Sequence, residues 1–457
     1  MGISEALTEL SSLLGQGLSL SKSDLELHGA SESYFDTIPP DAVAYPTSTN
    51  QVAEIVRICA AHQTPVIGWG TGTSLEAQTT PISGGICVDF SKMNAVLEVR
   101  PEDMIARVQP GCTREDLNAH LRATGLFFPV DPGANASLGG MAATRASGTT
   151  AVRYGTMRDN VLALEVVLAD GRVINTGTAA PKSSAGYDLT GLMVGSEGTL
   201  GLITELTLRL QGQPEAVSTA VSAFPSVENA VNAVIDTIQI GLPMARIELL
   251  DSSTVACVNA YSGLELPDAT QLLIEFHGSE GTVAEQVEMF REISESHEVI
   301  DFDWATKTED RNALWKARHN AYFAILASRP GSRAIVTDMC VPISRLAEAV
   351  EETRADIENS SISGPILGHV GDGNFHAILL IEENNPEELA IAKNLANRMA
   401  ERSLRLGGTV TGEHGIGVGK MPFMIAEHGE GWSIMADIKK ALDPNNIMNP
   451  GKMVQIN

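Results

Sequence analysis

Three glycine-rich loops in the first 210 residues constrain this chain most strongly. They lie at 68–74, 129–148 and 195–201, and the first of them directly follows a short apolar segment that indicates a strand. Glycine leaves backbone N–H groups open to a ligand. One such loop alone is most simply a tight turn. Three in one stretch favour an extended ligand that carries phosphate groups, although the first loop has neither the P-loop ending nor the G-x-G-x-x-G spacing.

The pattern of apolar residues predicts two α+β domains. The first, 1–212, has predicted helices at 50–62 and 114–123 and strands at 85–90, 106–110, 163–168 and 201–210. Longer helical patterns follow a short Gln-Gly-Gln-Pro linker, at 226–240, 282–296, 309–328 and 343–358, and alternate with strands at 244–250 and 271–276. We therefore expect a second domain over 213–440, closed by a turn-rich segment at 441–457.

Two histidines flank an Asp-Gly pair in the stretch 368–376. If Asp372-Gly373 forms the two-residue turn of a hairpin, as this dipeptide favours, His369 pairs directly with His376. Directly paired residues share one face of the sheet with their Cβ atoms about 5 Å apart. Both imidazoles could then reach one divalent ion, and strand alternation places Asn374 on the same face.

The stretch Gly412-Glu413-His414-Gly415 supplies a carboxylate and a third imidazole. A lone histidine is more often structural than a ligand, but the two stretches together predict a metal site. We predict His369, His376 and Glu413 as its ligands, a set that suits Zn, Mn, Fe or Co. His414 is the predicted general base, because the ordinary pKa of histidine is about 6.5. Neighbouring residues of a strand face opposite ways, so the two glycines must allow a bend.

The charge balance argues against several kinds of partner. The chain has 57 acidic and 31 basic side chains, for a formal net charge of −26. Binding to nucleic acid or to an anionic membrane surface is therefore not expected. We expect no transmembrane segment, no disulfide framework and no iron–sulfur cluster. The N-terminus lacks the features of a secretory signal, so the expected location is cytoplasmic, with a processed organellar form compatible with the same sequence.

The motifs taken together resemble a known family. Segments 65–75, 132–148, 153–155 and 195–204 resemble the FAD-binding domain of the vanillyl-alcohol oxidase and p-cresol methylhydroxylase (PCMH) superfamily. Segments 314–319, 341–342, 368–376, 412–417 and 443–452 resemble its FAD-linked oxidase C-terminal domain. The resemblance implies an α+β protein with a two-subdomain PCMH-type FAD-binding domain, an α+β substrate (cap) domain and a C-terminal segment that returns to the flavin.

The resemblance also implies how the cofactor is held. FAD is expected to be non-covalent, because the early glycine loop has no histidine of the kind that carries a covalent flavin in other members. Two positions depart from the family pattern: Glu76-Ala-Gln78 follows the first loop, and Arg145 stands where a small or amide residue is expected. The expected contacts are Gly70, Thr71, Gly72, Thr73, Ser74, Pro132, Gly133, Ser137, Gly140, Ser147, Gly148, Tyr154, Glu197, Gly198, Ile203 and Asn449.

Oxidation of a 2-hydroxy acid fits these residues. The hydroxyl proton must be removed, which a divalent ion assists by lowering the pKa of the hydroxyl, and the Cα hydrogen passes to the flavin as hydride. Arg318 is the candidate for the substrate carboxylate, because a guanidinium presents two donors. On one continuous helix Arg318 shares a face with Trp315 and Tyr322, so a packing role is the alternative. Asn374 is a further expected contact.

The predicted function is that of an FAD- and divalent-metal-dependent D-2-hydroxy-acid dehydrogenase. D-Lactate is the first choice, as in the cytochrome-linked D-lactate dehydrogenases that the chain resembles. A sister group acting on D-2-hydroxyglutarate uses a lysine where an alignment on Asp338 and Pro342 places Val336, so a small substrate side chain is favoured. Arg246 and Arg333 are the nearest cations that would reverse this preference.

Several alternatives remain open at this point. Within the same fold they are a glycolate or a D-2-hydroxyglutarate dehydrogenase. Of a different class is a metallohydrolase that uses the same three ligands, which would leave the glycine loops without a role. The sequence contains no haem motif, so the electrons are expected to pass to a separate cytochrome, quinone or electron-transfer flavoprotein, or to oxygen. The sequence does not indicate an oligomeric state.

Overall fold

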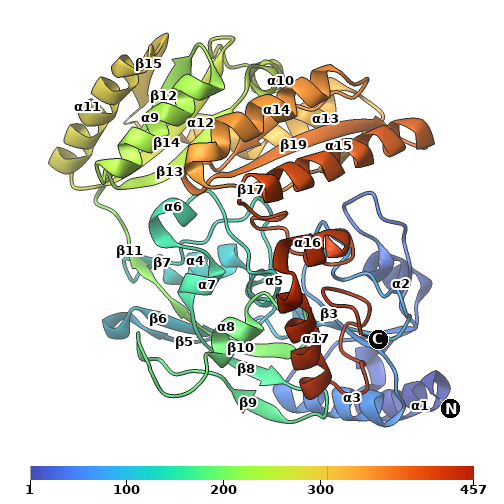
Figure 1. The fold of residues 1–457 in the computed structure, drawn as a ribbon. Coiled ribbons are helices and arrows are strands. Elements are labelled where there is room, and N and C mark those ends of the chain that lie inside the picture. The colour runs from blue at the N-terminus through green and yellow to red at the C-terminus, as the bar shows by residue number, and fades with distance from the viewer. Residues whose placement is uncertain (1, 306, 457) are drawn as a thin grey trace. The chain divides into compact units, whose positions relative to one another are not determined.

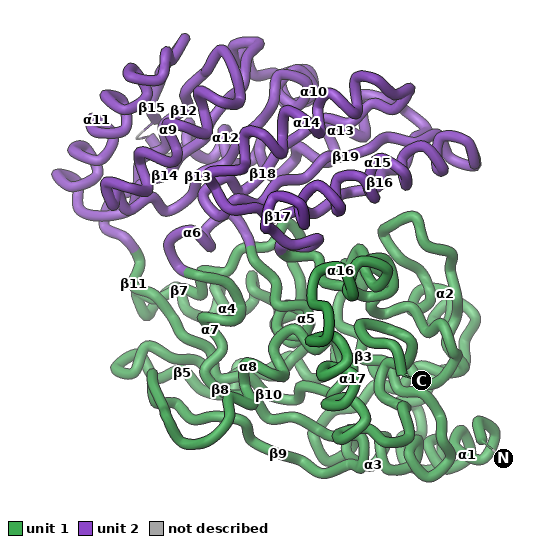
Figure 2. The backbone as a smooth tube through the Cα atoms, viewed as in Figure 1, with its two compact units in different colours: residues 1–147, 155–213, 413–457 green, residues 148–154, 214–412 purple. Residues whose placement is uncertain are grey.

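The computed structural model describes residues 2–305 and 307–456, which divide into two compact units (Figure 1 and Figure 2). The first unit comprises 1–147, 155–213 and 413–457, and the second comprises 148–154 and 214–412. The division after 213 lies next to the expected boundary at 212. Two other places differ: the returning C-terminal segment begins at 413 rather than 441, and the short segment 148–154 belongs to the second unit.

A small sheet forms one half of the first unit. It contains, in spatial order, β1 (Leu18–Ser19), β2 (Ala42–Ala44), β4 (Ile86–Asp89) and β3 (Val66–Trp69), and the last three run parallel. Helix α3 (Thr49–Ala61) begins at Ser48, whose hydroxyl accepts the N–H of Gln51. Its apolar side buries Val52 and Ile55 in one core with the strands, and α1 (Ile3–Leu14) packs there too. Helix α2 (Lys22–Gly29) completes this half.

A five-stranded antiparallel sheet forms the other half of the first unit. Its order is β5 (Val96–Arg100), β6 (Ile105–Val108), β10 (Leu202–Arg209), β8 (Val161–Val167) and β9 (Val173–Asn175). Around it lie α4 (Arg114–Leu121), α5 (Leu138–Thr144), α7 (Met157–Asn160) and α8 (Leu189–Met193), while β7 (Leu126–Phe127) pairs with β11 (Gln211–Gly212). Each sheet has a core of its own, so the unit has the two subdomains that the family resemblance implies.

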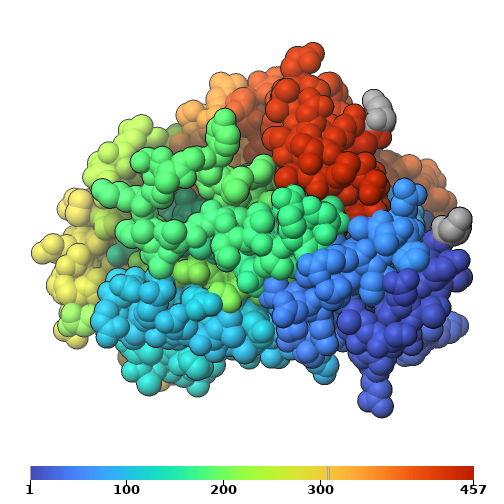
Figure 3. Space-filling model, turned by 90° about the horizontal axis from the view of Figure 1, so that it is seen from below, coloured from blue at the N-terminus to red at the C-terminus, as the bar shows by residue number. Residues whose placement is uncertain are grey.

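The C-terminal segment completes the first unit. It contains α16 (Met424–His428) and α17 (Glu430–Leu442), and Met448 forms a β-bridge with Val66 of β3. In Figure 3 these C-terminal residues, in red, lie beside N-terminal residues in blue. The ammonium group of Lys439 donates to the carbonyl oxygens of Thr199 and Met448 and is paired with Asp443. The contact with Thr199, just before β10, connects the segment to the five-stranded half, and the bridge to Val66 connects it to the small sheet.

An eight-stranded sheet forms the centre of the second unit, and its strand pairs are antiparallel. The order is β15 (Asp301–Ala305), β12 (Ala216–Phe224), β14 (Thr270–Gly278), β13 (Met244–Leu250), β18 (Ile366–Gly368), β19 (Asn374–Glu382) and β16 (Ser332–Val336), with β17 (Met339–Cys340) also on β19. The helices are α6 (Ala151–Tyr154), α9 (Val227–Gln239), α10 (Ser252–Ser262), α11 (Glu280–Ser296), α12 (Thr308–His319), α13 (Ala321–Ser328), α14 (Leu346–Glu358) and α15 (Pro386–Arg405).

Two findings on the helices bear on function. The single helix predicted over 309–328 is wrong, because the chain leaves helical geometry at Asn320 and forms α12 and α13 instead. Asparagine competes with the helical backbone for hydrogen bonds, so it favours such a break. Trp315 and Ile325, one from each of these helices, pack in a core with strand residues such as Leu273. Among the described residues, none of the helices is both long and apolar enough to cross a membrane.

Candidate active site

His369 and His376 lie close together, but not as a directly opposed pair. Strands β18 and β19 pair Leu367 with His376, so the predicted register is wrong. The connection is a 3-10 turn over Val370–Asp372 followed by Gly373 at φ +76, not a two-residue turn. His369 is therefore a diagonal neighbour of His376, with ring centroids 5.5 Å apart, and the two offer nitrogens within 4.8 Å of each other. The expected proximity is present although the expected pairing is not.

Glu248 of β13 orients His369. The Nδ1 of His369 lies 2.6 Å from Oε1 of Glu248, and Oε2 of the same carboxylate accepts the Nε of Arg318 at 2.9 Å. Burial raises the pKa of Glu248, but the charges of His369 and Arg318 outweigh it and hold the pKa below the ordinary value. Glu248 is thus an ionised acceptor for the Nδ1 of His369, the kind of outer partner that metal-ligating histidines have.

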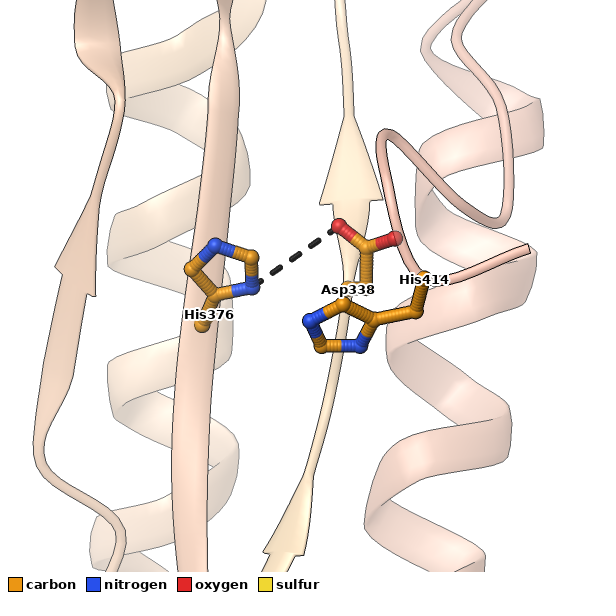
Figure 4. Close-up of side chains that lie close together, drawn as sticks. All are labelled: Asp338, His376 and His414. Atoms are coloured by element: carbon orange, nitrogen blue, oxygen red, sulfur yellow. Dashed lines mark ion pairs between the residues drawn. The ribbon is translucent and has the colours of Figure 1, made fainter. Parts of the chain in front are cut away.

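His376 presents its second nitrogen in the same way. Its Nδ1 lies 2.9 Å from the carbonyl oxygen of Thr337, which can only accept, so Nδ1 carries the proton. The same nitrogen is 3.7 Å from Asp338 Oδ1, the ion pair drawn in Figure 4. Both imidazoles therefore have a fixed donor at Nδ1, which is the arrangement of metal-ligating histidines. Asp338 is a site residue that the sequence motifs did not indicate.

Asn374 provides a third polar atom on the His376 face of β19. Its Nδ2 donates to Asp338 Oδ1 and to the carbonyl oxygen of Met339, both at 2.8 Å. Both partners are acceptors, so the orientation of the amide is fixed and Oδ1 points away from them. Oδ1 is buried without a hydrogen-bond partner among the described residues. A divalent ion or a donating hydroxyl would satisfy it, so the donor set fits a metal ion and a hydroxy acid.

Thr411 and Gly412, the last two residues of the second unit, lie beside Asp338 and Asn374. Gly412 is the last residue of the second unit, and a Cβ there would lie only 2.2 Å from Asn374 Nδ2. Thr411 donates to Asp338 Oδ2 at 2.7 Å. Glu413 and His414 themselves belong to the first unit, and their roles as ligand and base stay predictions.

Arg318 is buried and already paired. Its Nε and Nη2 both face Glu248, so a substrate carboxylate would meet the Nη1 side of the guanidinium. Trp315, one helical turn earlier, donates its indole N–H to Thr219. The prediction that Arg318 and Tyr322 share one face of a continuous helix is wrong, because Tyr322 lies beyond the helix break. The role of Arg318 in substrate binding stays a prediction, and Glu248 is the partner that the sequence reasoning missed.

The strand pairing shows which face of the sheet carries Val336 and Arg333. Val336 pairs with Ile378 in antiparallel β16 and β19, so it shares a face with His376. Arg333 pairs with Ile381, an odd-numbered position, and therefore starts on the opposite face. Arg246 stacks on the Trp315 ring at 4.8 Å, and its Nε lies 3.6 Å from Glu275. Val336 is thus an uncharged position on the histidine face.

The first glycine loop of the first unit lies against the start of α5. A Cβ at Gly70 would approach the Ser137 hydroxyl to 2.2 Å, and Gly72 adopts φ +73 against the Trp69 indole. The indole N–H of Trp69 and the hydroxyl of Ser74 are buried without hydrogen-bond partners among the described residues. These orphaned polar atoms beside open backbone fit a polar cofactor.

The other residues expected to contact FAD are divided between the two units. Pro132 and Gly133 precede Ser137, which caps α5 by accepting Gly140 N–H, and Ser147 follows that helix. Arg145, the departure from the family pattern, donates to the carbonyl oxygen of Val194 and thereby ties the end of α5 to the 195–201 loop. Ile203 is buried in the core of the five-stranded sheet. Gly148 and Tyr154 belong to the second unit, where the Tyr154 hydroxyl lies 2.7 Å from His277 Nδ1.

Asn449 and Glu197 are brought together in the first unit. Asn449 Nδ2 donates to the carbonyl oxygens of Glu197 at 2.7 Å and Gln78 at 3.0 Å, and its Oδ1 accepts from Lys452 at 2.6 Å. Burial raises the pKa of Glu197 to about 7 and lowers the pKa of Lys452 to about 7. The expected contacts from the 195–201 loop and the C-terminal segment therefore share one buried polar network.

Comparison with known proteins identifies the family. Residues 40–177 match the FAD binding domain, and residues 213–453 match the C-terminal domain of FAD linked oxidases. The chain belongs to the FAD-linked oxidase family. It is 48% identical to the probable mitochondrial D-lactate dehydrogenase of Danio rerio, with 96% of this chain and 90% of the relative covered. It is 42% identical to the mitochondrial D-lactate dehydrogenase [cytochrome] of Arabidopsis thaliana, at 98% and 80% coverage.

Two solved structures share the fold of this chain. The 4-ethylphenol oxidase of Gulosibacter chungangensis matches with a TM-score of 0.78 and 20% identity, at 99% coverage of this chain and 97% of that one. p-Cresol methylhydroxylase matches with a TM-score of 0.78 and 18% identity, at 98% and 96% coverage. The PCMH-type fold and an FAD-binding domain are thus confirmed, and this member of the family is an FAD-linked oxidoreductase.

Proposed function

We propose that the protein is an FAD- and divalent-metal-dependent dehydrogenase that oxidises D-2-hydroxy acids, D-lactate first, to 2-oxo acids. The observation that carries the proposal is the matched orientation of the two histidines. His369 and His376 each donate through Nδ1, to Glu248 and to Thr337, so both offer Nε2 to one ion. The relatives that act on D-lactate, at up to 48% identity, favour that substrate.

The residues divide the chemistry among them. When bound, FAD accepts the hydride from the substrate Cα, and a divalent ion on His369, His376 and Glu413 lowers the pKa of the substrate hydroxyl. Arg318 binds the carboxylate through its Nη1 side, while Glu248 keeps the guanidinium in place. Asn374 Oδ1 is a further oxygen ligand for this ion, beside the bound hydroxyl group. The imidazole of His414 takes the hydroxyl proton as general base.

The histidine face favours a small substrate side chain. Val336 pairs with Ile378, which is two residues after His376 on β19, so Val336 and His376 share a face. A substrate with a second carboxylate would need a cation at this position. Arg333 starts on the opposite face, and Arg246 is held by Trp315 and Glu275. Lactate, with its single methyl group, suits this environment better than a second carboxylate does.

Glycolate is the second candidate substrate. The chain is 36% identical to the glycolate oxidase subunit GlcD of Bacillus subtilis, over 91% of this chain and 89% of that relative. Glycolate lacks only the methyl group of lactate, and one methyl group in an apolar pocket changes selectivity by about 10-fold to 200-fold. The alternative of a metallohydrolase has lost its basis, because the family accounts for the glycine loops.

A separate protein is proposed as the electron acceptor. The relative from Arabidopsis thaliana and one from Saccharomyces cerevisiae, 37% identical, are both described as cytochrome-type D-lactate dehydrogenases. A cytochrome is therefore the first acceptor to try, before a quinone or an electron-transfer flavoprotein.

A substrate comparison with a soluble dye as acceptor tests the proposal. D-Lactate should give the highest kcat/KM among D-lactate, L-lactate, glycolate and D-2-hydroxyglutarate. If glycolate exceeds D-lactate, the second candidate replaces the first. The absence of turnover with every D-2-hydroxy acid would overturn the proposal.

A further inference from the structure

The turn that follows His414 is held by one buried carboxylate of the first unit. Glu197 accepts the backbone N–H of Ile416 at 2.6 Å and that of Gly417 at 2.8 Å, one on each oxygen. The Glu197 side chain is only 5% exposed. A carboxylate that accepts two backbone N–H groups in a buried place fixes their positions strongly.

A second side chain forms a hydrogen bond with the backbone of His414 itself. Gln78 Nε2 donates to the carbonyl oxygen of His414 at 2.6 Å, and Gln78 Oε1 is held in turn by the N–H of Glu76 at 3.0 Å. The space between these groups excludes a side chain at position 415. A Cβ at Gly415, where φ is +83, would lie 2.4 Å from Glu197 Oε1 and 2.8 Å from Gln78 Nε2.

Glu197 has a strained backbone that its neighbours stabilise. Its φ is +52, a left-handed conformation that is costly for a residue other than glycine and that concentrates at functional sites. Its N–H donates to the carbonyl oxygen of Ala143 in α5 at 2.8 Å, and its own carbonyl oxygen accepts from Asn449. One residue thus links α5, beside the expected flavin contacts, to the turn after His414.

We propose that Glu197 and Gln78 are positioning residues that fix the backbone from His414 to Gly417 and so aim the His414 imidazole. The inference rests on the proposed function for the role of His414. It assigns the Glu197 carboxylate to the turn rather than to the cofactor, which Glu197 would then contact only through its backbone. A misplacement of about 1 Å in a reacting group costs roughly 100-fold in rate, so this anchoring has a large effect.

The substitution Glu197→Gln tests the proposal in the holoenzyme. Glutamine keeps the shape but places an NH2 group against one backbone N–H. The rate of flavin reduction by D-lactate should fall by roughly 10-fold to 100-fold, with KM changed less than about twofold and FAD and metal content unchanged. Hydrogen exchange of the Ile416 and Gly417 amides should be about tenfold faster, and exchange in α5 should stay at the wild-type rate.

Two further variants complete the experiment. Glu165→Gln is the matched control, because Glu165 is a carboxylate of the same unit that accepts from Thr49 and Thr204 and should leave all readouts unchanged. Gln78→Met removes the donor to His414 and should reproduce the slower reduction, and it decides the matter if Glu197→Gln does not fold. Unchanged exchange and reduction rates would overturn the proposal, as would loss of FAD at wild-type exchange rates. If no hydroxy acid reduces the wild-type flavin, the proposed function fails, while amide exchange still decides whether Glu197 and Gln78 hold the turn.

Discussion

The Nδ1 of His369 lies 2.6 Å from Oε1 of Glu248, and the other oxygen of that carboxylate holds Arg318. One buried side chain thus orients both a proposed metal ligand and the proposed substrate-binding arginine. Glu248 lies on a strand, 70 positions before Arg318 on a helix and 121 positions before His369 in a loop. In the proposed mechanism, Glu248 therefore positions both a metal ligand and the arginine that binds the substrate carboxylate.

Replacing Glu248 by glutamine should weaken metal binding. The change removes the charged acceptor of the His369 Nδ1–H, and loss of such an outer partner lowers metal affinity by about 10-fold to 100-fold. Metal content after dialysis against a competing chelator, measured by mass spectrometry, checks this result. Glu275→Gln is the matched control, because Glu275 is also a buried strand carboxylate between a histidine, His277, and an arginine, Arg246. Equal retention of metal by Glu248→Gln and the wild type would contradict the assignment.

Replacing Val336 by lysine should redirect the substrate preference. The new ammonium group would lie on the His376 face and could pair with a second carboxylate, so kcat/KM for D-2-hydroxyglutarate relative to D-lactate should rise by about tenfold or more. Arg333→Ala, on the opposite face of β16, should leave this ratio unchanged. An unaltered ratio in Val336→Lys, or a changed one in Arg333→Ala, would show that the assignment of faces is wrong.

Replacing His414 by alanine should separate chemistry from binding. Loss of a general base costs about 100-fold to 10,000-fold in the rate of the step it assists. Rapid-mixing measurements of flavin reduction should show this loss, while flavin absorbance and metal content stay at wild-type values. His428→Ala, a histidine of α16 near a carboxylate at the surface, serves as control. A fast reduction in His414→Ala would exclude this residue as the base.

The stability of the protein should depend on the protonation of His28. Its Nδ1 faces the carbonyl oxygen of Asp24 at 2.7 Å and its Nε2 faces Asp89 at 2.9 Å, so both nitrogens donate and the ring is an imidazolium. Burial disfavours the charge, but these hydrogen bonds outweigh burial and raise the pKa above the ordinary value of 6.5.

The sign of the effect follows from that shift. A folded-state pKa above the unfolded value contributes stability that is fully present below pH 6.5 and is lost as the pH rises through the folded-state pKa. The melting temperature should therefore fall as the pH rises above about 6.5, and His28→Gln should have a flatter profile. Parallel profiles for the two proteins would show that His28 is not charged in the folded state.

The sequence predicts what local patterns determine. The strand before the first glycine loop, the helix at 50–62 and the alternation of helices and strands after residue 214 all follow from short-range periodicity. The hairpin register at 369–376 does not, because Gly373 is placed by tertiary packing: a Cβ there would lie 2.0 Å from the carbonyl oxygen of Val341.

Local sequence patterns also do not predict which side chains the site residues contact. Arg246 and Glu248 alternate on one strand, a signal that charged side chains face inward there, but the sequence does not tell which histidine and which arginine they meet. The break at Asn320 separates Tyr322 from Arg318 for a similar reason, since a single asparagine does not end a helix unless tertiary packing favours it.

The most direct test of the account is anaerobic flavin bleaching in the presence and absence of metal. The purified holoenzyme, mixed with D-lactate without oxygen, should lose its visible flavin absorbance, whereas L-lactate should leave it unchanged. After exhaustive chelation the flavin should stay bound but unbleached, and added Zn²⁺ or Mn²⁺ should restore the reaction. Equally fast bleaching by D-lactate after the metal has been removed would contradict the role assigned to His369 and His376.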